Sequence, residues 1–349
     1  MKYVINGKFL SQQQTGVQRM QYELIKALDN IIDDSDDITL LTPPDACEIP
    51  LRHIKVVKYG KLKGVLWEQI NLLQYELRNK ATGINLGNVA PFIKPDIVCI
   101  HDMNVKANPH FYSAKYRIWN NAQFFNIFRR AKMILTVSEF SKNEIIRIYK
   151  NLNMPVEVVK NAWQHFEKTE CDENALNKYG LTEKEYYFAL SSMAPNKNFN
   201  WIQKVAASNP DDMFVIAGMK KNDIYGDKGE LDRQDNVKCL GYVSDGEAKE
   251  LMKHSRAFLF PTLYEGFGIP PLEALSTGTD VIVSDTPCMH EVLQDAAEYI
   301  DPCRFDYKLD SIKGCSQQTR EKVLNMYGWD KSAKKLYEIL KRYEEHATK

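Results

Sequence analysis

The amino-acid sequence predicts two doubly wound α/β domains, each built on a parallel β-sheet. With 349 residues the chain is too long for one comfortable hydrophobic core, so two domains are expected. Short apolar runs alternate with amphipathic stretches from end to end, which is the pattern of strands connected by helices. The runs are rich in Val and Ile and do not alternate with polar residues, as strands covered on both faces require.

The predicted strands fall into two series along the chain. The first series is Tyr3–Asn6, Ile38–Thr42, Ile54–Val57, Ile97–His101, Met133–Val137 and Val156–Val159. The second series is Tyr186–Ser191, Met213–Ala217, Val237–Leu240, Ala257–Phe260, Asp280–Val283 and Glu298–Ile300. Amphipathic helices are expected at Val17–Leu28, Leu66–Arg78, Ser141–Tyr149, Ser244–His254, Pro270–Leu275 and Trp329–His346. Ligands of such sheets bind at the carboxyl ends of the strands, so the two domains are expected to face a common cleft.

The domain boundary is expected near Asn161–Gly180, where β-branched residues become rare and acidic residues increase. We therefore expect an N-terminal domain at 1–163 and a C-terminal domain at 164–326. Residues 327–349 are expected to form a helix that packs back on the N-terminal domain.

The net charge of zero conceals opposite charges in the two halves of the chain. Residues 1–165 contain 22 Lys and Arg against 15 Asp and Glu, whereas residues 166–349 contain 24 against 31. A basic first half suits an anionic acceptor or a membrane surface. Two solvated surfaces of opposite sign that help the domains face each other would explain the same asymmetry.

Hydropathy and cysteine usage favour a cytoplasmic protein. No run approaches eighteen apolar residues, and the start MKYVINGKFL lacks the apolar segment of a signal peptide. Seven cysteines without a C-x-x-C pair indicate reduced thiols. The expected location is the cytoplasm, with peripheral contact to the inner face of the cytoplasmic membrane as a further possibility.

The most informative segment is Ala257–Asp285, which is expected to form a strand, a loop, a helix and a second strand. Two glycines, Gly266 and Gly268, leave the loop backbone unshielded, and the Pro270–Pro271 pair favours a helix start. Exposed N–H groups at a helix N-terminus bind anions.

Two glutamates flank this predicted anion site. Glu265 lies in the loop before the helix, and Glu273 lies about one turn inside it. Carboxylates bind sugar hydroxyls well, so the pair suits a ligand with both phosphates and hydroxyls, such as a nucleotide sugar. A capping carboxylate and an unrelated solvated glutamate would give the same spacing.

The whole segment PTLYEGFGIPPLEALSTGTDVIVSD resembles the E-x7-E signature of family-4 glycosyltransferases, which are retaining enzymes with the GT-B fold. The resemblance implies that Glu273 binds the donor ribose and that Glu265 contacts the transferred sugar. The residues that it implies on the donor side are Glu273, Gly266, Phe267, Gly268, Ile269, Gly16, Asn196, Gly241, Tyr242 and Val243. Glu265, Lys197 and His101 are the implied catalytic residues.

Other segments are similar to the same family in the expected order. TGVQRMQYELIKAL resembles its first glycine loop and helix, and WEQINLL and NVAP resemble acceptor-domain features of the polysaccharide branch. VCIHDMN places His101 at a strand end, where the family keeps a histidine beside the sugar; a lone histidine there is more often structural. The acceptor-side candidates are Arg19, Asn88 and Asp102.

One segment, SSMAPNKNFNWI, departs from the family pattern. Lys197 is present, but Asn196 occupies a position where the family often has an arginine that grips the diphosphate. Loss of a bidentate guanidinium weakens the hold on the leaving group unless Arg19 or Lys220 compensates. The departure also favours the alternative that the chain is slow or inactive.

The resemblance implies front-face attack on the donor, assisted by the departing phosphate, rather than a covalent intermediate. No Asp-x-Asp at a strand end indicates a metal clamp, so we expect no metal and no cofactor besides the donor substrate. The expected donor is GDP-mannose, dTDP-rhamnose or a UDP-sugar. The expected acceptor is a glycan carried on a lipid diphosphate in surface polysaccharide synthesis.

Three other function classes were weighed. A dinucleotide-dependent dehydrogenase is disfavoured because GFGIPP lacks the third glycine of the fingerprint. A catalytically silent subunit that binds a nucleotide sugar, or a scaffold of a glycan assembly complex, remains the alternative function. Nucleic-acid binding is disfavoured because no basic stripe is interleaved with aromatic residues.

Overall fold

The computed structural model describes residues 2–218, 234–309 and 313–347. The chain divides into two compact units, the first formed by residues 1–103, 118–162 and 328–349, the second by residues 104–117 and 163–327. Each unit contains one parallel sheet, which confirms the predicted fold class. Residues 104–117 group with the second unit, although the sequence analysis assigned them to the N-terminal domain.

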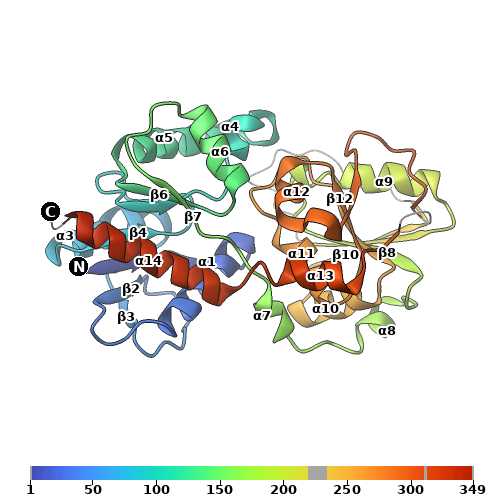
Figure 1. Ribbon diagram of the computed structural model, residues 1–349, viewed down its shortest axis with the longest axis horizontal. Helices are drawn as coiled ribbons and strands as arrows, with labels where there is room; N and C mark the ends of the chain where they lie inside the picture. The colour runs from blue at the N-terminus through green and yellow to red at the C-terminus, as the bar shows by residue number, and fades with distance from the viewer. Residues whose placement is uncertain (1, 219–233, 310–312, 348–349) are drawn as a thin grey trace. The chain divides into compact units, whose positions relative to one another are not determined.

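The first unit contains a seven-stranded sheet in the order β3-β2-β1-β4-β5-β6-β7 (Figure 1). Its strands are β1 (Tyr3–Asn6), β2 (Ile38–Thr42), β3 (Lys55–Lys58), β4 (Thr82–Asn85), β5 (Ile97–Cys99), β6 (Met133–Thr136) and β7 (Val156–Val158). The sequence analysis missed β4. Its sequence TGIN has a single large apolar residue, yet all four residues are buried between β1 and β5.

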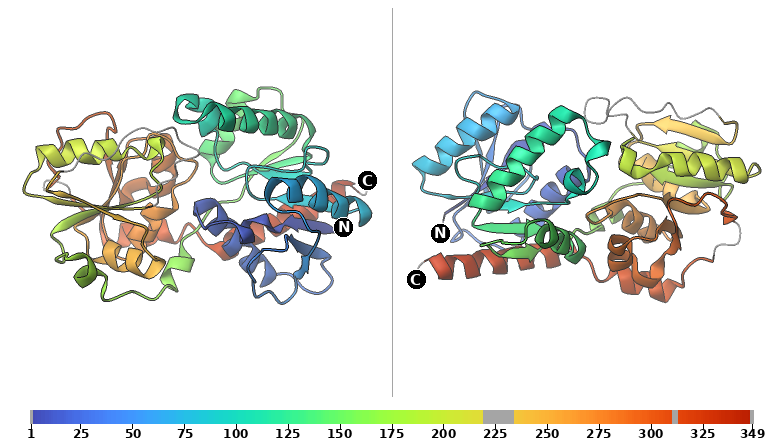
Figure 2. Two further views of the ribbon diagram at one scale, coloured as in Figure 1. Left: turned by 180° about the vertical axis from the view of Figure 1, so that it is seen from behind. Right: turned by 90° about the horizontal axis from the view of Figure 1, so that it is seen from above.

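Helices cover both faces of this sheet, as right-handed crossovers between parallel strands require. Helix α1 (Gly16–Asp29) lies along α14 (Trp329–Ala347), and Tyr3 Oη donates to the carbonyl of Leu340, 3.0 Å away (Figure 1). The opposite layer includes α3 (Leu73–Arg78) and α5 (Ala114–Arg130), which lie on the side of the sheet away from α14 in the right view of Figure 2. The remaining helical segments of the first unit are η1 (Gly7–Ser11), α2 (Gly64–Leu66), η2 (Trp67–Leu72) and α6 (Glu139–Ile148). The short helices α4 (Asn104–Ala107) and η3 (Pro109–Phe111) lie in the stretch that groups with the second unit.

The second unit contains a six-stranded parallel sheet in the order β10-β9-β8-β11-β12-β13. Its strands are β8 (Tyr186–Leu190), β9 (Met213–Ala217), β10 (Val237–Gly241), β11 (Ala257–Phe260), β12 (Val281–Ser284) and β13 (Glu298–Ile300). Its helices are α7 (Gln164–Glu167), α8 (Ala175–Tyr179), η4 (Pro195–Lys197), α9 (Phe199–Ser208), α10 (Asp245–His254), α11 (Ile269–Ser276), α12 (Pro287–Leu293), η5 (Gln294–Ala296) and α13 (Gln317–Leu324).

Each sheet has one point where the order of its strands reverses. In the first sheet, β1 is followed by β2 and β3 on one side, and the chain then crosses to β4 on the other side of β1. In the second sheet, the same reversal separates β8 from β11. The loops that leave the two central strands diverge to opposite faces at such a point, so they leave an opening for a ligand. Candidate sites are therefore expected after β1 and β4, and after β8 and β11.

In the part of the chain that the structure describes, no helix combines the length and the apolarity that a membrane span needs.

Glu76 of α3 is a buried carboxyl packed against β4. Its side chain has 0% exposure and lies against Gly83, where an added Cβ would come within 2.4 Å of Oε1. Neither carboxyl oxygen has a hydrogen-bond partner among the described residues. Burial raises the pKa of Glu76 to about 8, so this carboxyl is neutral in the folded protein at neutral pH.

We predict that Glu76→Gln stabilises the protein at high pH. The unfolded chain loses the Glu76 proton near its ordinary pKa, whereas the folded chain keeps it until pH 8. The wild type therefore loses up to about 1.4 kcal/mol of stability per pH unit across this window. In urea unfolding, the variant should gain stability over the wild type as the pH rises from about 5 to about 8. Glu48→Gln, at an exposed position, is the control. An equal gain for both variants would contradict a raised Glu76 pKa.

Candidate functional site

The loops after β8 and β11 bring a cation and a carboxylate together at the reversal point of the second sheet. Lys197 follows β8, Glu265 follows β11, and Lys197 Nζ forms an ion pair with Glu265 Oε1. The ammonium also lies 5.4 Å from the centre of the Phe260 ring. The two side chains are only 18% and 14% exposed, so solvent screens the pair weakly while a ligand can still reach it.

Asn196 holds the loop that carries Glu265. Its backbone carbonyl accepts from the N–H of Leu263 at 2.7 Å, and its Nδ2 donates to the carbonyl of Tyr264 at 3.2 Å. Asn196 is 6% exposed, so its side-chain amide stabilises the loop and does not face the solvent. The cation beside Glu265 is thus Lys197. The compensating candidate Lys220 lies outside the described residues.

The turn after Glu265 brings the backbone to the start of α11. Gly268 has a φ of 88°, a left-handed conformation that favours glycine. A Cβ at Gly268 would lie 2.8 Å from Met289 Cε. The Phe267 ring is buried edge-on against Tyr327, with ring centres 5.3 Å apart, and α11 begins at Ile269. The N-terminus of α11 therefore follows directly on the ion-paired loop.

Glu273, the second glutamate of the motif, lies within α11 and is held by a histidine that the sequence analysis missed. His165 Nε2 lies 2.8 Å from Glu273 Oε1, and the two side chains are 4% and 12% exposed. His165 belongs to α7 and precedes Glu273 by 108 residues, so no local pattern could reveal the pairing. The contact fixes the orientation of the carboxylate.

The segment after β10 lies at the same end of the sheet, beside β9. Gly241 has a φ of 70° and its carbonyl accepts from the N–H of Gly218 at 2.7 Å. Tyr242 is 70% exposed and Val243 is buried. Ser244 then caps α10 in a capping box with Glu247. The Gly241–Val243 backbone is thereby fixed between a strand and a capped helix.

The candidates of the first unit include one ordered pair. The His101 N–H donates to Asn88 Oδ1 at 2.7 Å, and the His101 ring lies with Nε2 2.8 Å from the carbonyl of Leu86. A carbonyl only accepts, so Nε2 carries the proton. Burial lowers the pKa of His101, which keeps the ring neutral and leaves Nδ1 without a proton. Asp102 is the next residue and is half-buried.

Gly16 and Arg19 lie at the start of α1 in the same unit. Gly16 is the first residue of the helix, is exposed, and has no atom within 4 Å of the position that a Cβ would take. Arg19 lies one turn into α1 and is half-buried. The helix N-terminus is therefore open to a ligand, although the unliganded protein gives no steric reason for glycine there.

No group of three or more His, Cys, Asp or Glu side chains with the spacing of a metal site occurs among residues 2–218, 234–309 and 313–347.

Comparisons with known proteins relate the second unit to a described family and the whole chain to known structures. Residues 172–306 match the family Glycosyl transferases group 1. The chain is 27% identical over 229 residues to O-antigen chain mannosyltransferase B of Escherichia coli, and the aligned region covers 60% of this chain and 58% of that protein. It is 25% identical over 325 residues to O-antigen chain mannosyltransferase RfbU of Salmonella typhimurium, and this aligned region covers 86% of each protein.

Among solved structures, sucrose-phosphate synthase from Thermosynechococcus elongatus has the same fold, with a TM-score of 0.73, 13% identity and 99% of each chain covered. The family match includes Lys197, Glu265 and Glu273. His165 lies before it.

We predict that the backbone at Gly268 tolerates no side chain. Gly268→Ala should lower the free energy of unfolding by about 1–3 kcal/mol from left-handed strain, and further through the contact with Met289. Gly241 has a φ of 70° and open space around it, so Gly241→Ala should be destabilised by the left-handed strain alone. Gly16→Ala should be neutral because neither reason applies.

Urea unfolding of the three glycine variants measures this order. Equal stability of Gly268→Ala and Gly16→Ala would show that the turn before α11 is not constrained as described.

Proposed function

The chain carries a group 1 glycosyltransferase domain and has the GT-B fold, and on that premise we propose that it transfers mannose, with retention of configuration, from a nucleoside-diphosphate donor to a hydroxyl of a glycan. The names of the two mannosyltransferase relatives support the sugar. The observation that carries the proposal is the Lys197–Glu265 pair at the reversal point of the second sheet, beside the α11 N-terminus and followed by Glu273.

The donor is held by two carboxylates with different tasks. Glu273, oriented by His165, accepts hydrogen bonds from the ribose hydroxyls. Glu265 accepts hydrogen bonds from the hydroxyls of the transferred sugar. When the donor binds, Lys197 turns from Glu265 toward the diphosphate and, with the N–H groups of residues 266–268, stabilises its charge. The Gly241–Val243 backbone faces the base.

The transfer step needs orientation and charge stabilisation more than a nucleophile from the protein. The acceptor oxygen attacks the anomeric carbon on the face from which the diphosphate departs. The bond between that carbon and the phosphate oxygen breaks, and the leaving phosphate oxygen takes the proton of the acceptor hydroxyl. The products are the new glycoside and a nucleoside diphosphate, and no metal is required.

The first unit supplies the acceptor side. Asn88 and the neutral ring of His101 lie after β4 and β5, and both offer groups that bind hydroxyls. We propose a glycan carried on a lipid diphosphate as the acceptor, because residues 1–165 carry an excess of basic side chains that suits an anionic carrier at a membrane surface.

We predict unequal effects for the two glutamates. Glu265→Ala should lower turnover by at least about tenfold, because it removes contacts that strengthen as the sugar departs. Glu273→Ala should mainly raise the donor Kd, and His165→Phe should do the same to a smaller degree. The measurements are nucleoside diphosphate release with mixed glycan acceptors and calorimetric titration of GDP-mannose, UDP-glucose and dTDP-rhamnose.

Glu298→Ala, at an exposed position of β13, is the matched control and should behave as the wild type. Unchanged kinetics in both glutamate variants would refute the site. Donor binding without turnover in the wild type, across all acceptors, would instead identify a silent nucleotide-sugar-binding subunit.

We predict that the transfer rate is unchanged after dialysis against EDTA, because Lys197 and the α11 N-terminus take the place of a metal clamp. NMR of the product should show the anomeric configuration of the donor. A rate that falls with EDTA and is restored by Mg²⁺ or Mn²⁺ would contradict the metal-independent part of the proposal.

A further inference from the structure

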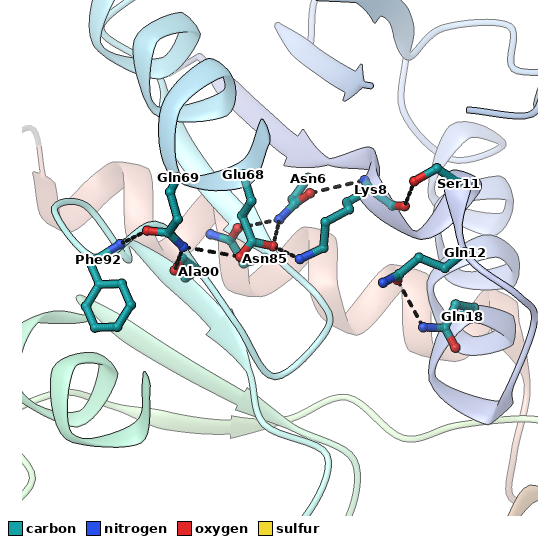
Figure 3. Close-up of polar contacts among 10 residues, drawn as sticks. All are labelled: Asn6, Lys8, Ser11, Gln12, Gln18, Glu68, Gln69, Asn85, Ala90 and Phe92. Carbon is teal, nitrogen blue, oxygen red and sulfur yellow. Dashed lines mark hydrogen bonds and ion pairs between the residues drawn. The ribbon is translucent and has the colours of Figure 1, made fainter. Parts of the chain in front are cut away.

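A continuous hydrogen-bond network occupies the reversal point of the first sheet, between β1 and β4 (Figure 3). It starts at Phe92 in the loop after β4 and ends at Ser11, the last residue of the 3-10 helix η1 (Gly7–Ser11), which follows β1. Its centre is a pair of neighbouring residues, Glu68 and Gln69, from the helical segment η2. The loop after β4 contains the acceptor-side candidate Asn88, and the segment after β1 precedes Arg19.

The segment η2 is a π-helical turn, a rare structure that is frequent at functional sites. Its wider turn lets successive side chains reach fixed partners. Trp67 Nε1 donates to the carbonyl of Tyr59 at 2.7 Å, and Asn71 Oδ1 accepts from the N–H of Leu62 at 3.1 Å. Trp67 is completely buried. Glu68 and Gln69 therefore project from a backbone that is anchored on both sides.

Gln69 holds the loop after β4 with both ends of its amide. Its Oε1 accepts from the N–H of Phe92 at 2.9 Å, and its Nε2 donates to the carbonyl of Ala90 at 3.0 Å (Figure 3). A carboxylate could not donate to Ala90, and an apolar side chain could do neither. The same loop contains Asn88, which has a left-handed conformation with a φ of 63°. Its Oδ1 accepts a hydrogen bond from the backbone N–H of His101.

Glu68 holds the loop after β1. Its carboxylate is completely buried, forms an ion pair with Lys8 Nζ, and accepts from Asn6 Nδ2 at 3.1 Å. Asn6 Nδ2 also donates to Asn85 Oδ1 at 3.0 Å, which links β1 to β4. Ser11 Oγ donates to the carbonyl of Lys8 at 2.9 Å. A buried charge is retained only with such partners, so the network locks the start of both loops.

Glu68 and Gln69 also contact each other, since Gln69 Nε2 lies 3.3 Å from Glu68 Oε1. We propose that these two residues are positioning residues for the glycan acceptor, which act by holding the loops 86–92 and 8–15 in the conformation that receives it. This inference rests on the proposed function.

The loops carry groups suited to sugar hydroxyls. Gln12 lies on the segment 8–15 and Asn88 on the loop 86–92, and Gln12 Oε1 accepts from Gln18 Nε2 in the first turn of α1 at 3.1 Å. Amides both donate and accept, as hydroxyls do. A loop that is already ordered loses less entropy when it binds, so a rigid framework beneath these amides increases acceptor affinity. The donor site in the second unit contains none of these residues.

The experiment compares Gln69→Leu with Gln74→Leu, the same substitution at an exposed position of α3. Gln69→Leu should raise the acceptor KM by about tenfold, as expected for two lost hydrogen bonds, while kcat and the donor KM stay within about twofold. Amide hydrogen exchange of residues 86–92 should become faster in this variant and not in the control. Equal acceptor KM and equal exchange in both variants would overturn the inference, and so would a rise in donor KM as large as that in acceptor KM.

A second set of variants tests the charges. Lys8→Met and Glu68→Gln should each speed exchange in residues 8–15, because each leaves one buried member of the pair without its charge partner. The double variant removes both charges, so residues 8–15 should exchange more slowly in it than in either single variant. It should also regain part of the acceptor affinity. Additive damage in the double variant would contradict the pairing as the source of loop order.

Hydrogen exchange requires no substrate, so it decides the loop-holding role even if the wild type transfers no sugar. In that case the proposed function fails, and faster exchange in Gln69→Leu alone would still support the loop-holding role. An active wild type with unchanged exchange and acceptor KM in Gln69→Leu would overturn the inference and leave the proposed function intact.

Discussion

The reversal of strand order in each parallel sheet is the constraint on which the rest of this protein depends. Side chains that follow the two central strands are brought to one end of the sheet, and the connecting chain leaves room there for a ligand. In the second unit this rule collects Lys197 and Glu265 from segments 68 residues apart. In the first unit it collects Asn6 and Asn85, and the π-helical turn adds Glu68 to them.

The two reversal points are used differently. The second unit presents Lys197 and Glu265 as a partly exposed pair, so a ligand can exchange places with a partner, whereas Glu273 is held by the buried His165. In the first unit the carboxylate of Glu68 is completely buried and its partner Lys8 is only 11% exposed, so this pair serves the segments that it connects. This division suits a transferase, which needs a site that holds a charged donor and a separate, pre-ordered surface for the acceptor.

The sequence was sufficient for the architecture and for the local conformation of the segment that contains Glu265 and Glu273. The buried strands rich in Val, Ile and Phe were recognisable because a continuous apolar run can be identified without knowledge of its tertiary contacts. The loop from Pro261 to Gly268 was recognisable because its proline and glycines favour a turn. Strand β4 escaped because its burial comes from neighbours, not from its composition. His165 and Gln69 escaped for the same reason, since their partners lie 108 and 23 residues away, and the loop-holding use of Asn196 depends on the carbonyl of Tyr264.

The most direct measurement of the central claim is amide hydrogen exchange with and without saturating GDP-mannose. A donor held by the second unit should slow exchange in residues 191–197, 261–273 and 241–243, because those backbones become covered or bonded. Residues 8–15 and 86–92 should change little until an acceptor is added. Unchanged exchange around Lys197, Glu265 and Glu273 at a donor concentration that demonstrably binds would contradict the account, since the donor would then lie elsewhere.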